Sequence, residues 1–190
     1  MAFNFNKMNW KILASKYISN HQYFTARVDT CQMPNGKIID EYFVVELPIT
    51  VCALAVTKQQ QAVIIKQYRH PIKQILNEIP GGFIDKGETP MQAIARELLE
   101  ETGYSFEAIY QVGTIAANPG VLDSITHLFL ATGGQKITAQ ALDSNEEIEV
   151  TLLPIETVRA MLENNQFVQA LHTSCLLYAF KKWDQLQVKK

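Results

Sequence analysis

The stretch GFIDKGETPMQAIARELLEETGY, residues 82–104, decides how this chain folds. Its second half predicts a helix. Thr89 can cap the N-terminus, Pro90 suits the first helical position, and Gln92 completes a capping box. Gly103 suits the left-handed position at which a helix stops. The stretch therefore predicts a loop that leads directly into a helix ending at Gly103.

Apolar and acidic residues fall on different arcs of this helix, at about 100° per residue. We expect the buried arc to hold Met91, Ile94, Ala95, Leu98 and Leu99. Glu97, Glu100 and Glu101 lie on a separate arc and are neighbours, with Ala93 among them leaving room for a ligand. Like charges at this spacing destabilise a helix by about 0.2–0.5 kcal/mol per pair. A hard cation would reverse that cost, because Mg²⁺ prefers carboxylate oxygens, water and phosphate.

The whole stretch resembles the signature of a known family. The pattern G-x5-E-x7-R-E-U-x-E-E-x-G-U, with U apolar, is the Nudix box. The chain matches it at Gly82, Glu88, Arg96, Glu97, Leu98, Glu100, Glu101, Gly103 and Tyr104. Tyr104 departs slightly, since the last apolar position is usually aliphatic. The resemblance implies a metal-dependent hydrolase that cleaves the pyrophosphate of a nucleoside diphosphate linked to another group.

The resemblance also implies a metal site. Glu97 and Glu101 correspond to the principal ligands of Mg²⁺ or Mn²⁺, and Glu100 contributes directly or through water. The carbonyl of Gly81 resembles the backbone ligand supplied just before the box. Together the three glutamates are the implied catalytic carboxylates. Metal ions that bridge a diphosphate neutralise its charge and orient a water for attack on phosphorus.

Four further box residues have implied structural roles. Glu88 and Arg96 resemble the pair that holds the loop against the helix, and arginine can hold carboxylates in a bidentate manner. Gly82 and Gly103 are the glycines at the two ends of the box.

Residues outside the box resemble the ADP-ribose pyrophosphatase and nucleotide-sugar branch of the family. Gln67-Tyr68-Arg69 and the run Glu78–Gly82 (EIPGG) match short motifs of that branch, and Pro119 follows Gly103 by 16 residues. These features imply substrate contacts by Arg69, Glu78 and Pro119. ADP-ribose, cleaved to AMP and ribose 5-phosphate, is the expected substrate. GDP-mannose or another nucleotide sugar is the alternative substrate. A non-catalytic nucleotide-sugar sensor is a third possibility, for which a degraded box would be expected.

The general base is left open by the sequence. The branch often draws a glutamate from an acidic loop before a late strand, which here reads ALDSNEEIEV over residues 141–150. Glu146, at the edge of that loop, is the first candidate. Glu147 and Glu149 alternate and so share one strand face, where both can simply be solvated. A glutamate of the box is the other candidate.

The order of elements predicts an α+β fold, a Nudix-type mixed sheet sandwiched between helices. Hairpins are expected at Asn35-Gly36 and around Gln59–Gln61, and two final helices near residues 155–163 and 168–183. Residues 1–46 are expected to form an antiparallel β extension and residues 47–190 the catalytic domain. The extension cannot bury its own faces, so we expect it to form a homodimer.

Composition narrows the remaining choices. A net charge of −2 argues against a nucleic-acid-binding surface, and no apolar run is long enough for a membrane span. The N-terminal residues show no signal-peptide pattern. The three cysteines are widely spaced and odd in number, which favours free thiols in a reducing compartment. We therefore expect a cytoplasmic protein.

Overall fold

The computed structural model describes residues 8–21, 24–144 and 146–188. Its contacts divide the chain into two compact units. The first comprises residues 1–48 and 118–124, and the second comprises residues 49–117 and 125–190. Residues 1–7 and 22–23 of the predicted extension lie outside the described residues. The segment 118–124 belongs with the first unit, although the sequence placed it in the catalytic domain.

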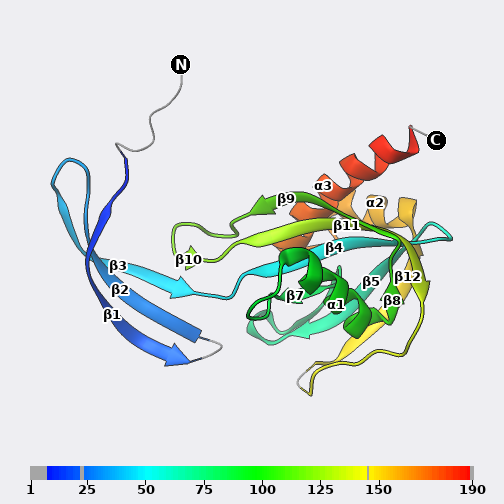
Figure 1. The fold of residues 1–190 in the computed structure, drawn as a ribbon, viewed down its shortest axis with the longest axis horizontal. Helices are drawn as coiled ribbons and strands as arrows, with labels where there is room; N and C mark the ends of the chain where they lie inside the picture. The colour runs from blue at the N-terminus through cyan, green and yellow to red at the C-terminus, as the bar shows by residue number, and fades with distance from the viewer. Residues whose placement is uncertain (1–7, 22–23, 145, 189–190) are drawn as a thin grey trace. The chain divides into compact units, whose positions relative to one another are not determined.

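The first unit is a sheet in the order β1-β2-β3-β10 (Figure 1). Its strands are β1 (Lys11–His21), β2 (Phe24–Gln32), β3 (Ile38–Glu46) and β10 (Leu122–Asp123). The first three are antiparallel, and β10 pairs with β3 in parallel. The predicted turn between β2 and β3 is confirmed: Gly36 has a φ of 86°, and the backbone N–H of Lys37 donates to Asn35 Oδ1 at 3.0 Å.

The second unit contains a mixed sheet in which β12-β5-β4-β11-β8 are neighbours, while β6, β7 and β9 pair with β5, β4 and β11. Strands β4 and β11 are parallel and the other pairs are antiparallel. The strands are β4 (Thr50–Thr57), β5 (Gln61–Arg69), β6 (Gln74–Glu78), β7 (Gly81–Phe83), β8 (Tyr104–Ser105), β9 (Ala108–Ile115), β11 (Thr126–Lys136) and β12 (Ile148–Pro154). The predicted β4–β5 hairpin turns at Gln60, which has a φ of 59°.

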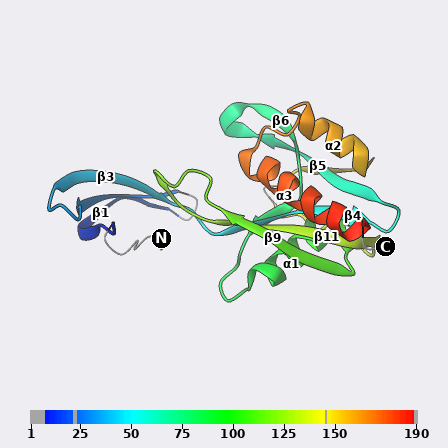
Figure 2. The same cartoon turned by 90° about the horizontal axis from the view of Figure 1, so that it is seen from above.

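Helices cover both faces of this sheet. Figure 2 shows α1 on one face of β4 and β11 and α3 on the other. The helices are α1 (Pro90–Thr102), α2 (Ile155–Glu163) and α3 (Ala170–Gln187), with a short 3-10 turn, η2 (His70–Ile72). The period of two divides β4 between two cores, because Cys52 and Leu54 pack towards α3 whereas Val51 and Ala53 pack towards α1. The predicted fold class is confirmed. No helix among the described residues is long and apolar enough to cross a membrane.

Helix α1 begins and ends as predicted, but its buried face is rotated. The capping box of Thr89 and Gln92 is formed, and Gly103 ends the helix with a φ of 76°. Met91 and Ala95 were expected to be buried and are exposed. Ala93, expected to leave room among the carboxylates, is fully buried in the core. The buried face of α1 is rotated towards the acidic arc, because Arg96 and the backbone N–H of Gly81 donate hydrogen bonds to the carboxylates of that arc.

Candidate active site

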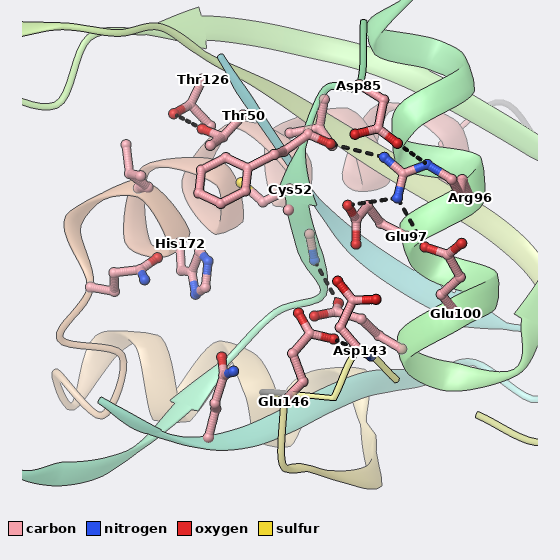
Figure 3. Close-up of a pocket in the computed structure, with 18 of the residues that line it drawn as sticks. Thr50, Cys52, Asp85, Arg96, Glu97, Glu100, Thr126, Asp143, Glu146 and His172 are labelled. Atoms are coloured by element: carbon pink, nitrogen blue, oxygen red, sulfur yellow. Dashed lines mark hydrogen bonds and ion pairs between the residues drawn. The ribbon is translucent and has the colours of Figure 1, made fainter. Parts of the chain in front are cut away.

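The second unit contains a cavity of about 420 Å³, lined by residues from segments far apart in the chain. The carboxylates of Glu97, Glu100, Glu101, Asp143 and Glu146 and the guanidinium groups of Arg69 and Arg96 line it. In Figure 3, Arg96, Glu97 and Glu100 lie on one side of the cavity and His172 on the other. The cavity thus has a strongly acidic wall on α1, opposite the first turn of α3.

The loop before α1 is fastened to the helix by one bidentate ion pair. Arg96 Nε donates to Glu88 Oε1 at 2.9 Å and Nη2 donates to Glu88 Oε2 at 3.0 Å. Arg96 Nη2 also donates to the carbonyl of Phe83 at 2.9 Å. These bonds from Arg96, with one from the Asp85 backbone, lower the pKa of Glu88. The structure therefore contains the predicted Glu88–Arg96 pair, which fixes the loop against α1.

The same arginine holds two carboxylates of the acidic wall. Arg96 Nη1 lies 2.9 Å from Glu97 Oε1 and 2.9 Å from Glu100 Oε2. The hydrogen bonds to Glu88, Glu100 and Glu97 raise the pKa of Arg96. One positive charge therefore serves three carboxylates, and the wall retains excess negative charge.

Glu101 is held from the other side by the strand before the box. The backbone N–H of Gly81 donates to Glu101 Oε2 at 2.8 Å, and Glu101 is only 4% exposed. Both glycines of the strand lie in close contact with their neighbours. A Cβ on Gly81 would lie 2.2 Å from the carbonyl oxygen of Val51, and a Cβ on Gly82 would lie 2.4 Å from Glu97 Oε1. Strand β7 therefore packs directly against Glu97 and Glu101, with no room for a side chain between them.

Burial makes the charged forms of these carboxylates costly. Burial raises the pKa of Glu97 to about 7; Arg96 opposes the shift, and Glu100 and Glu146 add to it. Burial also raises the pKa of Glu101; the hydrogen bond from the Gly81 N–H and the charge of Arg69 oppose the shift, and repulsion from Glu97 and Glu146 adds to it. Raised carboxylate pKa values of this kind are common at functional sites. The positive charge of Arg96 is therefore too little to balance all the carboxylates of the wall.

Arg69 enters the cavity from β5 and is held by a buried carboxylate. Arg69 Nε and Nη2 donate to the two oxygens of Glu78 at 2.8 and 2.5 Å. Glu78 is fully buried and is not among the residues that line the cavity. The sequence predicts a substrate contact for Glu78, whereas the structure places Glu78 behind Arg69, because both carboxylate oxygens accept hydrogen bonds from that side chain.

Of the remaining predicted site residues, Glu146 lines the cavity, whereas Glu147, Glu149 and Pro119 do not. Glu146 lines the cavity, and its Oε2 accepts from the backbone N–H of Asp143 at 3.2 Å. Glu147 and Glu149 do not line it; both are exposed, and Glu149 lies 3.7 Å from Lys66 Nζ. Pro119 belongs to the first compact unit and does not line the cavity either.

Comparison with known proteins agrees with this geometry. The sequence profile of the NUDIX domain matches residues 46–171. This chain belongs to the Nudix family. The profile of the nucleoside diphosphate sugar hydrolase N-terminal domain matches residues 10–45.

Two named relatives and one solved structure are similar to this chain over most of its length. The ADP-ribose pyrophosphatase of Bacillus subtilis is 32% identical over 186 residues, which is 95% of this chain and 100% of that protein. The methanol dehydrogenase activator of Bacillus methanolicus is 35% identical over 77% of this chain and 82% of its own length. A crystal structure of an ADP compounds hydrolase superposes with a TM-score of 0.80 at 20% identity, covering 94% of this chain and 95% of that one. That structure supports the fold.

Nudix hydrolases use divalent metal ions, and the acidic wall fits one. Among the described residues, no three His, Cys, Asp or Glu side chains are gathered into a ready-made metal cage. In the structure, Arg96 donates to one oxygen of Glu97 and to one oxygen of Glu100. Mg²⁺ seldom needs such a cage, since it keeps several waters and binds one or two carboxylates together with substrate phosphates. The hard oxygen donors and the missing positive charge therefore suit a divalent cation.

No sequence pattern indicated which residues form the opposite wall of the Nudix cavity. His172 and Gln169 line the cavity at the start of α3, and Gln67 lines it from β5. His172 is buried within LHTSCLL, which reads as an ordinary core segment of a helix. Only the packing of α3 against β4 and β11 brings this turn to the cavity.

Proposed function

We propose that this Nudix enzyme hydrolyses the pyrophosphate bond of a nucleoside diphosphate sugar, with ADP-ribose cleaved to AMP and ribose 5-phosphate. The observation that carries the proposal is the joint placement of three box carboxylates and Arg69 around one cavity. An acidic wall that requires a cation and a cationic side chain nearby suit a diphosphate. The names of relatives, ADP-ribose pyrophosphatase and ADP-sugar pyrophosphatase, support this substrate class.

We assign the cation as Mg²⁺, with Mn²⁺ able to replace it. Glu97, Glu100, Glu101 and the carbonyl of Gly81 would hold it. The bound cation supplies charge neutralisation of the diphosphate and lowers the pKa of an attacking water. Arg96 keeps the Glu97 and Glu100 carboxylates in place through its two 2.9 Å bonds, while the Gly81 N–H fixes Glu101.

Glu146 is our candidate for the general base. It lies on a separate segment from the box, lines the cavity, and interacts electrostatically with Glu97, Glu101 and Arg69. It would accept a proton from the water that attacks phosphorus. If a box glutamate is the base instead, Glu146→Gln will leave kcat within threefold of wild type rather than lowering it by about 10²-fold or more.

Arg69 is assigned to bind the diphosphate or the terminal ribose. Its guanidinium is partly exposed to the cavity and is fixed by two bonds from behind, so little conformational freedom is lost when substrate binds. Glu78 is then a positioning residue rather than a substrate ligand. Pro119 is retained as a proposed substrate contact, to be tested by Pro119→Ala.

We also propose a homodimer, formed through the first unit, in the cytoplasm. Strand β1 exposes apolar side chains on both of its faces, including Ile12 and Ile18, which are 59% and 60% exposed. A second copy related by a two-fold axis would cover them. The three free thiols suit a reducing compartment. Light scattering at micromolar concentration tests the dimer, and a strictly monomeric mass would contradict it.

A substrate screen tests the function. Product release is measured with ADP-ribose, GDP-mannose, other nucleotide sugars, dinucleoside polyphosphates and nucleoside triphosphates, each with Mg²⁺ and with EDTA. We expect ADP-ribose to have the highest or nearly the highest kcat/KM and EDTA to abolish turnover. A kcat/KM for nucleoside triphosphates tenfold above ADP-ribose, about 1.4 kcal/mol of discrimination, would overturn the branch assignment. A preference for GDP-mannose would favour the alternative substrate.

A further inference from the structure

The first turn of α3 presents an unsatisfied hydrogen-bond acceptor near the cavity. Gln169 is the N-cap residue of α3, yet its side chain makes no capping bond. Its Oε1 is buried and has no hydrogen-bond partner, and within the described part of the chain it is the one buried side-chain oxygen or nitrogen in this condition. Gln169 is also one of the residues that line the cavity.

A buried acceptor without a donor is unusual in a folded protein. Desolvation of the carbonyl is not repaid by any bond, so such atoms are rare outside sites where a ligand or water supplies the missing group. Gln169 lines the cavity together with Leu171 and His172, which follow it closely in the chain. The missing partner of Oε1 is therefore a hydrogen-bond donor.

His172 supplies the complementary donor one turn of chain away. Its Nδ1 accepts from the backbone N–H of Ile79 at 3.4 Å. Burial, with Arg69 nearby, lowers the pKa of His172 to about 3, so the ring is neutral at physiological pH. A neutral imidazole that accepts at Nδ1 carries its proton on Nε2. Nε2 has no hydrogen-bond partner among the described residues, so its N–H is available to a ligand.

We propose that Gln169 and His172 together bind a sugar hydroxyl of the substrate and so determine specificity for the sugar. A hydroxyl both donates and accepts, so one group can donate to Gln169 Oε1 and accept from His172 Nε2–H. A phosphate oxygen carries no proton to donate and would leave Oε1 unsatisfied. Figure 3 places His172 across the cavity from Arg96, Glu97 and Glu100, away from the carboxylates that would face the diphosphate. The inference rests on the proposed function.

The first experiment replaces the amide by a side chain of similar length that cannot form hydrogen bonds. Gln169→Met is expected to raise KM for ADP-ribose about tenfold, the effect of one lost hydrogen bond, and to leave kcat within threefold. The melting temperature without substrate should be unchanged or higher, because the substitution removes an unsatisfied acceptor. The control is Gln166→Met, an exposed amide that does not line the cavity, which should change neither quantity.

The second experiment identifies the hydroxyl. ADP-ribose is compared with ADP-glucose and with an analogue that carries 2′-deoxyadenosine, which separate the distal sugar from the nucleoside ribose. Wild type should discriminate against one of them, and Gln169→Met should lose most of that discrimination. Binding of ADP-ribose and of ADP is also titrated in EDTA, so the comparison does not depend on turnover.

The outcomes separate this inference from the proposed function. Wild-type enzyme that neither binds nor hydrolyses any nucleotide sugar contradicts the proposed function and the inference with it. Active wild-type enzyme with an unchanged KM in Gln169→Met overturns the inference alone and shows that Oε1 is satisfied by water. An equal drop in stability and activity, without a change in KM, would also overturn it, because that result indicates a purely structural glutamine.

Discussion

Replacing Gly82 by alanine tests whether the position of the Glu97 carboxylate sets the rate of hydrolysis. The added Cβ would lie 2.4 Å from Glu97 Oε1 and 2.5 Å from its carboxyl carbon. An ordinary contact begins near 3.4 Å, so the carboxylate must move by about 1 Å. A misplacement of about 1 Å commonly costs about 10²-fold in rate. We expect kcat of Gly82→Ala to fall by that factor.

Stability should change little in the same variant. The atoms that must move belong to the flexible end of one side chain, whereas a Cβ on Gly81 would meet the backbone of Val51 and Cys52. Losing the 2.9 Å bond between Glu97 and Arg96 costs about 1 kcal/mol. The lower entropy of the unfolded chain returns about 0.4–1 kcal/mol. Gly82→Ala should therefore melt within a few degrees of wild type, while Gly81→Ala should be strongly destabilised.

The assay pairs AMP release from ADP-ribose in excess Mg²⁺ with thermal melting. Gly113→Ala is the matched control, because a Cβ there would meet nothing closer than 3.5 Å. It should leave both quantities near wild type. A Gly82→Ala enzyme that folds normally and keeps kcat within threefold of wild type would refute the reasoning, since the Glu97 carboxylate would then have moved without consequence.

Further predictions concern Glu101, Leu98, Glu97 and His172. Glu101→Gln should be at least as stable as wild type in EDTA, because burial penalises the charged form of Glu101, yet it should lower kcat by about 10²–10³-fold. Leu98→Ala should instead cost about 2–5 kcal/mol of stability, since Leu98 is fully buried. Burial raises the pKa of Glu97 from 4.5 to about 7, so the folded protein keeps a proton that the unfolded chain loses near pH 4.5. Without metal, the contribution of Glu97 to stability is therefore complete below pH 4.5 and is lost as pH rises to about 7. Mg²⁺ competes with that proton, and the rise in Tm on adding Mg²⁺ should be larger at pH 8 than at pH 6; an equal rise would contradict this. The pKa of His172, lowered to about 3 from 6.5, has the opposite sign, so its contribution is complete above pH 6.5 and falls by roughly 2 kcal/mol at pH 5. Urea titrations of His172→Gln should show a flatter loss of stability between pH 7 and 5 than wild type, and parallel curves would be evidence against a buried neutral imidazole.

Local features of the chain could be predicted because their causes lie within a few residues. Thr89, Pro90 and Gln92 form the helix start through bonds to their own backbone neighbourhood. The Asn35-Gly36 turn depends on its own backbone conformation. The box spacing is equally local, since Glu88 and Arg96 meet once the loop and helix exist. Family, fold class and the acidic wall were therefore determined by sequence alone.

The tertiary structure decided which face of α1 is buried and what stands opposite it. Periodicity counts apolar residues, but burial depends on which partners are available. Glu101 is buried because Gly81, 20 residues earlier, donates to it, while Met91 remains 42% exposed. Glu78 is likewise buried because its two oxygens accept hydrogen bonds from Arg69. His172 and Gln169 reach the cavity only because α3 packs across β4 and β11. Contacts between segments so distant in the chain have no period or motif, so only the folded structure could reveal them.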